Sequence, residues 1–219
     1  SGKVNAFHTL SVALFAVILH YAFTYTGLSI IGSGKTALLK QLGVLFYICF
    51  SFLFFKNEKF SYRKIIGAAI CVCGIIVLNT DSLRFSLGSG EILIISASFC
   101  TVVANISSKK LVSKVSSTAL AGVSQLIGGF VLTLTGILSH GKIGTVNIKG
   151  ILIFAAIILC SCIGYCLWYE VVKKENLSNL FTIKFLEPIF AGIFSALIFG
   201  ENIWKLSYLF ALVLTFIAI

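Results

Sequence analysis

The chain has 219 residues, of which 58% are hydrophobic and only 11% are charged. Soluble domains carry about 25% charged residues, so this composition excludes an ordinary soluble domain and indicates a membrane protein. The net charge of +10 alone would suit a nucleic-acid partner, and the placement of the basic residues decides against that function.

Eight apolar segments approach the length of about 20 residues that a membrane-spanning helix needs. They cover residues 7–31, 34–55, 62–79, 90–108, 117–138, 148–172, 177–199 and 205–219. We therefore predict an all-α membrane protein. The last segment is short and the chain contains no methionine, so we expect the sequence to be cut at both ends.

Basic loop residues divide unequally between the two sides of the membrane if the helices alternate in direction. Ten lie on one side, namely Lys3, Lys56, Lys59, Arg63, Lys64, Lys109, Lys110, Lys114, Lys173 and Lys174. Five lie on the other side, namely Lys35, Arg84, Lys142, Lys149 and Lys205. The richer side is predicted to be cytoplasmic. The positive charge is thus a topology signal, and we predict no nucleic-acid partner.

The segment 21–55 matches the segment 165–199 at a shift of 144 residues. The identical pairs include Tyr21/Tyr165, Tyr25/Tyr169 and Lys40/Lys184. Matching Phe or Leu means little in so apolar a chain. A matching lysine means more, because a charge in hydrocarbon costs about 2.5–3.5 kcal/mol on insertion scales unless it meets water, a partner or a ligand. Repeated halves with a charge at the same depth suggest a transporter with its site between them.

Duplication also predicts the helix count. The segments 90–108 and 117–138 have no upstream counterpart, whereas the last three segments match the first three. We therefore expect ten helices in the intact protein, about eight of them present here, in two repeats of five. An odd number of helices in each repeat forces the two repeats to insert in opposite orientations.

Several motifs resemble those of EamA repeats in the drug/metabolite transporter superfamily. They are Tyr21-Ala-Phe-Thr-Tyr-Thr-Gly-Leu-Ser29, Phe55-Lys-Asn-Glu-Lys59, Phe185-Leu-Glu-Pro-Ile-Phe190 and Phe199-Gly-Glu201. The resemblance implies that residues 1–80 hold the last three helices of one EamA repeat and that residues 81–219 hold the second. It also implies a central cavity and alternating access. The first repeat has Gly43 where the second has Glu187, so the two halves of the site should be chemically unequal.

Lys184, Glu187 and Pro188 form the densest group of functional candidates. Pro188 is the only proline, and within a helix it cannot donate to the carbonyl four residues back, which we expect to be left free at Lys184. Lys184 and Glu187 share a helix face and can pair. The group is either a substrate or proton site, or a buried ion pair that fixes a kinked helix.

Lys40 is the repeat counterpart of Lys184. It either extends to the membrane interface or lines a cavity, where the two lysines would clamp a carboxylate or phosphate. The phosphate-translocator branch of the superfamily is similar in holding its anion with basic residues on the corresponding helices, which implies that Lys40 and Lys184 bind the anion.

Further candidates lie in the apolar segments. His20 is either a proton relay or a partner in an interhelical hydrogen bond. The aromatic residues either bind a ring or cation or simply pack; they are Tyr21, Tyr165, Trp168 and Tyr169. Asn105 and Gln125 either bind substrate or join helices. Glu170 is expected to be solvated. Hinges are predicted at Gly27, Gly43 and Pro188.

The leading hypothesis is a secondary transporter of a small organic solute that carries a carboxylate or phosphate, with proton coupling through Glu187 and His20. One alternative is an exporter of amines, lipophilic cations or drugs, which would use Glu187 and the aromatic residues. Another is a membrane receptor that transports nothing. We predict no enzyme activity, no metal and no cofactor. The partners are the solute and the lipid bilayer, the chain is a monomer or homodimer, and the expected location is a bacterial cytoplasmic membrane.

Overall fold

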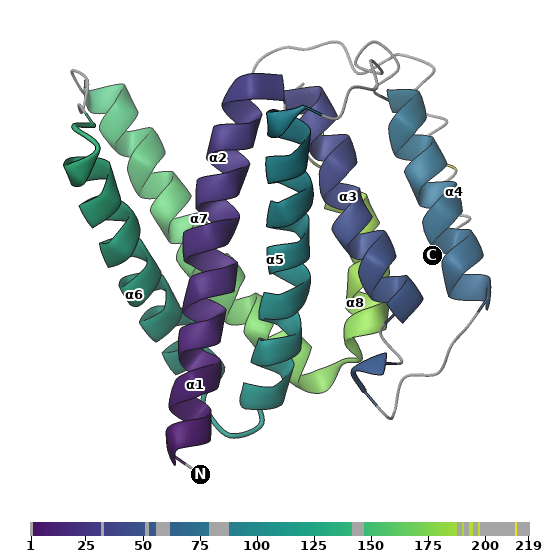
Figure 1. The fold of residues 1–219 in the computed structure, drawn as a ribbon, viewed down its shortest axis with the longest axis horizontal. Coiled ribbons are helices and arrows are strands. Elements are labelled where there is room, and N and C mark those ends of the chain that lie inside the picture. Colours follow the sequence, from purple (N-terminus) through teal and green to yellow (C-terminus); the bar gives the residue numbers. More distant parts are fainter. Residues whose placement is uncertain are drawn as a thin grey trace. The chain divides into compact units, whose positions relative to one another are not determined.

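The structure, a computed structural model, describes residues 2–31, 33–50, 53–55, 62–78, 88–141 and 147–187, and residues 190, 193–194, 197 and 213. Every regular element in these residues is a helix (Figure 1). Four helices are long and apolar enough to cross a membrane, namely Ala6–Ile31, Ser89–Leu111, Ser117–Leu138 and Ile148–Lys174. The prediction of an all-α membrane protein is confirmed.

The chain divides into two compact units, each built from two separate stretches of sequence. Unit 1 comprises Ser1–Ala22 and Val103–Glu175, and unit 2 comprises Phe23–Val102 and Asn176–Ile219. Because each unit combines segments from both halves of the sequence, residues far apart in the chain meet within one unit.

Unit 1 contains α1 (Gly2–Val12), the π-helix η1 (Ala13–Leu19), the start of α2 (His20–Ile31), the end of α5 (Ser89–Leu111), α6 (Ser117–Leu138) and α7 (Ile148–Lys174). Unit 2 contains the rest of α2 and α5, with α3 (Ser33–Phe50), α4 (Tyr62–Leu78), α8 (Leu177–Ile183) and the 3₁₀ helix η4 (Lys184–Leu186). Up to residue 183 the predicted segments match these helices to within a few residues, except that the segment 34–55 extends past α3, which ends at Phe50. The predicted helix 205–219 lies outside the described residues apart from Val213.

Side-chain oxygens cap the amino-terminal ends of three of the membrane helices. Ser116 Oγ accepts a hydrogen bond from the Ala119 amide at 3.2 Å ahead of α6. Asn147 Oδ1 accepts one from the Gly150 amide at 2.8 Å ahead of α7. Glu91 reaches back from the first turn of α5 to the Gly88 amide. Such caps satisfy amides that the helix itself leaves without acceptors, which fixes where each helix starts.

In unit 1, α6 packs closely on η1. Val17 of η1 is only 2% exposed, and it faces Gly128 of α6. A methyl group added at Gly128 would lie 2.4 Å from the Val17 Cβ. Glycine is therefore required at this contact, because any side chain would push the two helices apart.

In unit 2, small residues bring α2 and α3 close to α5. An added Cβ at Gly27 would lie 2.7 Å from Ile94 Cδ1, and one at Gly43 would lie 2.8 Å from the Ser98 carbonyl oxygen. Both glycines are therefore close-packing positions, and their role as hinges stays a prediction. The third predicted hinge, Pro188, lies outside the described residues.

Candidate functional site

The two repeat-equivalent lysines both lie in unit 2. Lys40 lies on α3 and Lys184 begins η4. Each ammonium group is attracted electrostatically to the Glu187 carboxylate, and the Lys184 ammonium is also repelled by the charge of Lys40. Both lysines are half-buried and Glu187 is exposed. We call Lys40, Lys184 and Glu187 the lysine cluster.

The helix that carries Lys184 changes its geometry at that residue. The α-helix α8 ends at Ile183, and a 3₁₀ turn covers Lys184–Leu186. The Glu187 amide donates to the Lys184 carbonyl. The expectation of a free carbonyl at Lys184 is therefore wrong, because a tighter 3₁₀ turn supplies a donor one residue earlier than an α-helix would.

Aromatic rings position the lysine cluster. The Lys184 ammonium lies 5.5 Å from the centre of the Phe181 ring, within the range of a cation–π interaction. Phe181 in turn stacks on Tyr47 of α3, with ring centres 4.3 Å apart. Both rings are fully buried. This stack joins α3 to α8, so it fixes the two helices that hold the two lysines.

A second repeat-equivalent pair meets in unit 1. The Tyr21 and Tyr165 hydroxyls lie 2.8 Å apart and share a hydrogen bond. The His20 ring packs edge-on against Tyr21 at 5.3 Å. The sequence predicted Tyr21 and Tyr165 as equivalent residues, and the structure adds that they contact each other directly.

Most of the other polar candidates of unit 1 are engaged in hydrogen bonds. Trp168 Nε1 donates to Asn105 Oδ1 at 2.8 Å, and Tyr169 lies near the buried Ser124, whose hydroxyl donates to the Ala121 carbonyl. Gln125 differs, since its Nε2 is buried and has no hydrogen-bond partner within the described structure. We call the other residues of this group, together with Tyr21 and Tyr165, the hydroxyl cluster: Tyr21, Asn105, Ser124, Tyr165, Trp168 and Tyr169.

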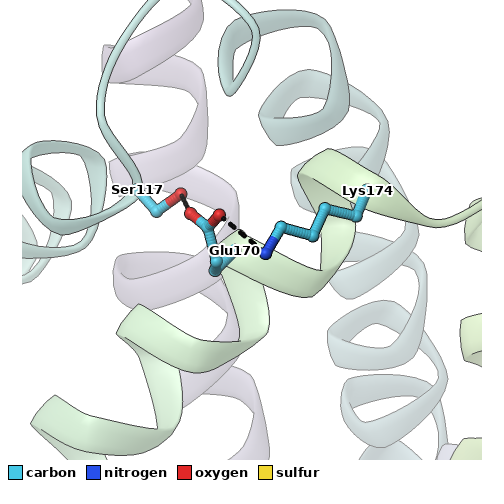
Figure 2. A network of polar contacts seen from close by, with 3 residues as sticks. All are labelled: Ser117, Glu170 and Lys174. Atoms are coloured by element: carbon cyan, nitrogen blue, oxygen red, sulfur yellow. Dashed lines mark hydrogen bonds and ion pairs between the residues drawn. The ribbon is translucent and has the colours of Figure 1, made fainter.

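The sequence suggested that Glu170 is solvated, but the structure shows that its side chain also makes two polar contacts. Its carboxylate accepts a hydrogen bond from Ser117 Oγ at 2.8 Å and pairs with the Lys174 ammonium at 3.4 Å (Figure 2). The side chain nevertheless stays 42% exposed. The contact connects α6 to α7, and sequence alone gave no sign of it because Ser117 is 53 residues away.

Lys109 also has a structural role that the sequence did not reveal. Its ammonium donates to the carbonyl oxygens of Val172 and Glu175, both at 2.6 Å. These carbonyls lie at the end of α7, where the helix has no amides left to bond them. A lysine at the carboxyl end of a helix also complements the helix dipole.

Comparison with known proteins then identifies the family. The model of the EamA-like transporter family matches the chain twice, over residues 2–80 and 88–219. The chain belongs to the EamA-like transporter family. It is an integral membrane protein of a transporter family, and an enzymatic activity is not expected of it.

Relatives and a solved structure agree with this assignment. An uncharacterized transporter of Archaeoglobus fulgidus is 23% identical over 87% of this chain and 68% of its own length. A WAT1-related chloroplastic protein of Arabidopsis thaliana is 27% identical over 99% of this chain and 54% of its own length. One crystal structure is 17% identical in sequence, and its match covers 96% of this chain and 74% of the chain in that structure, with a TM-score of 0.80. That match supports the fold. The chain thus spans about half to two thirds of these two relatives.

Proposed function

We propose that this EamA-family chain is part of a secondary-active, alternating-access transporter of a small organic anion, and that Lys40 and Lys184 bind the anionic group. The observation that carries the proposal is the lysine cluster. Two lysines from equivalent positions of the repeat interact with a single carboxylate. A carboxylate or phosphate is the ligand chemistry that paired ammonium groups bind best.

The charge balance of the cluster favours an anion. When both lysines are protonated, Lys40 and Lys184 contribute two positive charges and Glu187 contributes one negative charge, so one positive charge is left over. Uncompensated charge is costly inside a membrane protein. A bound monoanion would neutralise the cluster, whereas a bound cation would add to its excess charge.

The same electrostatic interactions argue against the hypothesis of a cation exporter. Glu187 already interacts with two ammonium groups, which lowers its attraction for an external amine. Three of the aromatic residues proposed for a cation are hydrogen-bonded, Tyr21 and Tyr165 to each other and Trp168 to Asn105. The cation hypothesis therefore serves as an alternative outcome of the test, as does the hypothesis of a receptor without transport.

The remaining roles form part of the same proposal. Gln125 has a buried amide nitrogen without a partner in the described structure, so it is proposed to hydrogen-bond the solute. Asn105 and the aromatic residues are proposed to shape the binding surface. His20 and Glu187 are proposed to couple protons to transport, and Gly27, Gly43 and Pro188 to serve as hinges. We place the protein in a bacterial cytoplasmic membrane as a monomer or homodimer.

Ligand-dependent thermal stabilisation of the complete natural protein in detergent tests the proposal. Panels of carboxylates, phosphates, zwitterions and quaternary ammonium ions would be compared for the unmodified protein and for Lys184→Gln, Lys40→Gln and Lys173→Gln. A ligand that binds the folded state raises its stability according to concentration over Kd. Lys173 is an exposed lysine near the end of α7, so it controls for the loss of a positive charge.

We expect stabilisation by a carboxylate or phosphate series, lost in Lys184→Gln and Lys40→Gln and kept in Lys173→Gln. Unchanged anion affinity in both cluster variants would refute the assigned site. Stabilisation by quaternary ammonium ions alone, abolished in Glu187→Gln, would establish the cation exporter instead. Transport assays in vesicles with the stabilising ligand would then separate a transporter from a receptor.

A further inference from the structure

Five lysines gather at the end of unit 1 where α5 and α7 both finish, namely Lys109, Lys110, Lys114, Lys173 and Lys174. The stretches 109–114 and 170–175 that hold them contain two acidic residues, Glu170 and Glu175, so three positive charges remain in excess. None of these residues belongs to the lysine cluster, which lies in unit 2. The proposed solute site therefore leaves this charge unexplained.

Lys109 joins the two helix ends. Its ammonium donates to the carbonyl oxygens of Val172 and Glu175, both at 2.6 Å, which holds the end of α5 beside the end of α7 (Figure 1). Lys110 follows Lys109 on α5, and Lys173 lies between the two acceptors on α7. Both of these lysines are exposed. Lys109 thereby places exposed lysines of two helices at one location.

A turn after α5 keeps another exposed lysine at this end. The Lys114 amide donates to the Leu111 carbonyl at 2.8 Å, so the chain stays close to the last turn of α5. Neither Lys110 nor Lys114 forms an ion pair with any residue that the structure describes. Lys174 pairs with Glu170 at 3.4 Å (Figure 2), and its side chain is still 70% exposed. We call the exposed lysines the basic patch: Lys110, Lys114, Lys173 and Lys174.

An apolar surface of α7 leads up to the basic patch. Leu167 and Val171 stand at helical spacing with Lys174 on one face of α7, and all three are exposed. Among the four candidate membrane spans, this helix is the most apolar and the least buried. A phospholipid matches such a surface, because its acyl chains contact the apolar side chains while its headgroup meets the lysines. A soluble anion would use the lysines alone.

The charge distribution favours the membrane surface as the source of the anion. The lysines lie on the side that the basic loops predict to be cytoplasmic, and the cytoplasmic leaflet carries anionic lipids. The first turn of α7, at the opposite end of the helix, carries the single lysine Lys149. The excess positive charge therefore lies where anionic headgroups are found.

We propose that the basic patch binds the headgroup of one anionic phospholipid, whose acyl chains lie along the exposed face of α7 that contains Leu167 and Val171. Lys109 is a positioning residue, since its ammonium is bonded to backbone carbonyls and holds the two helix ends together. The proposal concerns a bound lipid and does not depend on the transported solute.

Native mass spectrometry measures lipid binding to the complete natural protein after its lipids have been removed in detergent. Phosphatidylglycerol and phosphatidylcholine with identical acyl chains would be titrated into the unmodified protein and into Lys110→Gln/Lys173→Gln. The matched control is Lys142→Gln/Lys149→Gln, which removes two lysines between the end of α6 and the first turn of α7. Soluble glycerol phosphate, which carries a phosphate but no acyl chains, would be added as a competitor.

We expect the unmodified protein and the matched control to prefer phosphatidylglycerol, and the double variant to lose that preference. A basic residue near an anionic membrane surface contributes roughly a fivefold factor in affinity, so removing two should weaken phosphatidylglycerol binding about 25-fold. Phosphatidylcholine binding should stay unchanged. Lys110→Arg/Lys173→Arg should keep the preference, because it keeps both charges.

Three results would overturn the proposal. The first is equal affinity of the unmodified protein for the two lipids. The second is equal weakening in the double variant and the matched control, because the effect would then follow from net charge alone. The third is displacement of the lipid by glycerol phosphate at a similar concentration, which would assign the patch to a free phosphate. If the double variant is unstable in phosphatidylcholine, Lys114→Gln gives the same test with an expected loss of about fivefold.

Discussion

The lysine cluster and the hydroxyl cluster are built from the same repeat but stabilised by different interactions. Each contains a pair of equivalent residues, Lys40 with Lys184 in unit 2 and Tyr21 with Tyr165 in unit 1. The lysines interact through long-range charge, whereas the tyrosines share a short hydrogen bond. We propose that the excess charge of the lysine cluster attracts a ligand, whereas the tyrosine pair bonds within itself. The two pairs lie at equivalent positions of the predicted repeat, and their residue types suit them to different roles.

The largest effect is expected where the hydroxyl cluster depends on close helix packing. Gly128→Leu should destabilise the protein by about 3 kcal/mol, the upper range for overpacking, because a side chain there meets Val17. Ser124, one turn earlier on α6, would be moved away from Tyr169. Urea denaturation in detergent, followed by tryptophan fluorescence, measures the change.

Gly129→Leu is the matched control for Gly128→Leu. A Cβ at Gly129 meets no atom within 4 Å, and leucine has a higher helix propensity than glycine, so this substitution should not lower the stability. Equal destabilisation by the two substitutions would mean that close packing between α6 and η1 is not what positions Ser124.

A smaller loss of stability is expected from Trp168→Phe. This substitution keeps an aromatic ring but removes the indole N–H that donates to Asn105 at 2.8 Å. Because Asn105 is buried, loss of its donor should cost about 1–3 kcal/mol. The same denaturation assay tests it, and Trp204→Phe, which keeps Trp168, controls for the altered fluorescence. An unchanged midpoint would show that the Trp168–Asn105 bond does not stabilise unit 1.

The sequence relates cluster residues to each other only through the internal repeat or through helical spacing. Lys40, Lys184, Tyr21 and Tyr165 were predicted because duplication leaves matching residues at a fixed spacing. The bond from Trp168 to Asn105 was not, since it joins residues 63 positions apart that no pattern relates. Long-range contacts of single side chains depend on how helices pack, and apolar periodicity does not determine helix packing.

Local rules also had limits. The lone proline predicted an irregular helix near Lys184, and the structure has a 3₁₀ turn there. It did not predict that the Glu187 amide would bond the Lys184 carbonyl. Likewise, Lys109 was predicted only as a cytoplasmic charge, and its contact with the end of α7 follows from tertiary structure alone.

Removing the negative charge from the lysine cluster should raise its affinity for anions, which the uncharged hydroxyl cluster is not expected to bind. Glu187→Gln removes the carboxylate that interacts with the two ammonium groups. An external anion then no longer competes with this carboxylate for the lysines. We expect the anion affinity to rise roughly tenfold, which corresponds to about 1.4 kcal/mol. Calorimetric titration with the stabilising carboxylate or phosphate measures this, and raising the ionic strength should reduce the gain. A fall in anion affinity would mean that Glu187 organises the lysines for binding.

The smallest effect is expected at the tyrosine pair, where a double-mutant cycle isolates one hydrogen bond. Tyr21→Phe and Tyr165→Phe each remove one hydroxyl of the 2.8 Å contact, and the double variant removes both. If the hydroxyls bond each other, the double variant should be more stable than the sum of the single losses predicts, by about 1 kcal/mol. Additive losses would show that each hydroxyl is stabilised by other groups. Because two neutral hydroxyls carry no net charge, this coupling should not change between low and high salt, whereas anion binding at the lysine cluster should weaken. Salt dependence thus distinguishes the two clusters even where their free energies are similar.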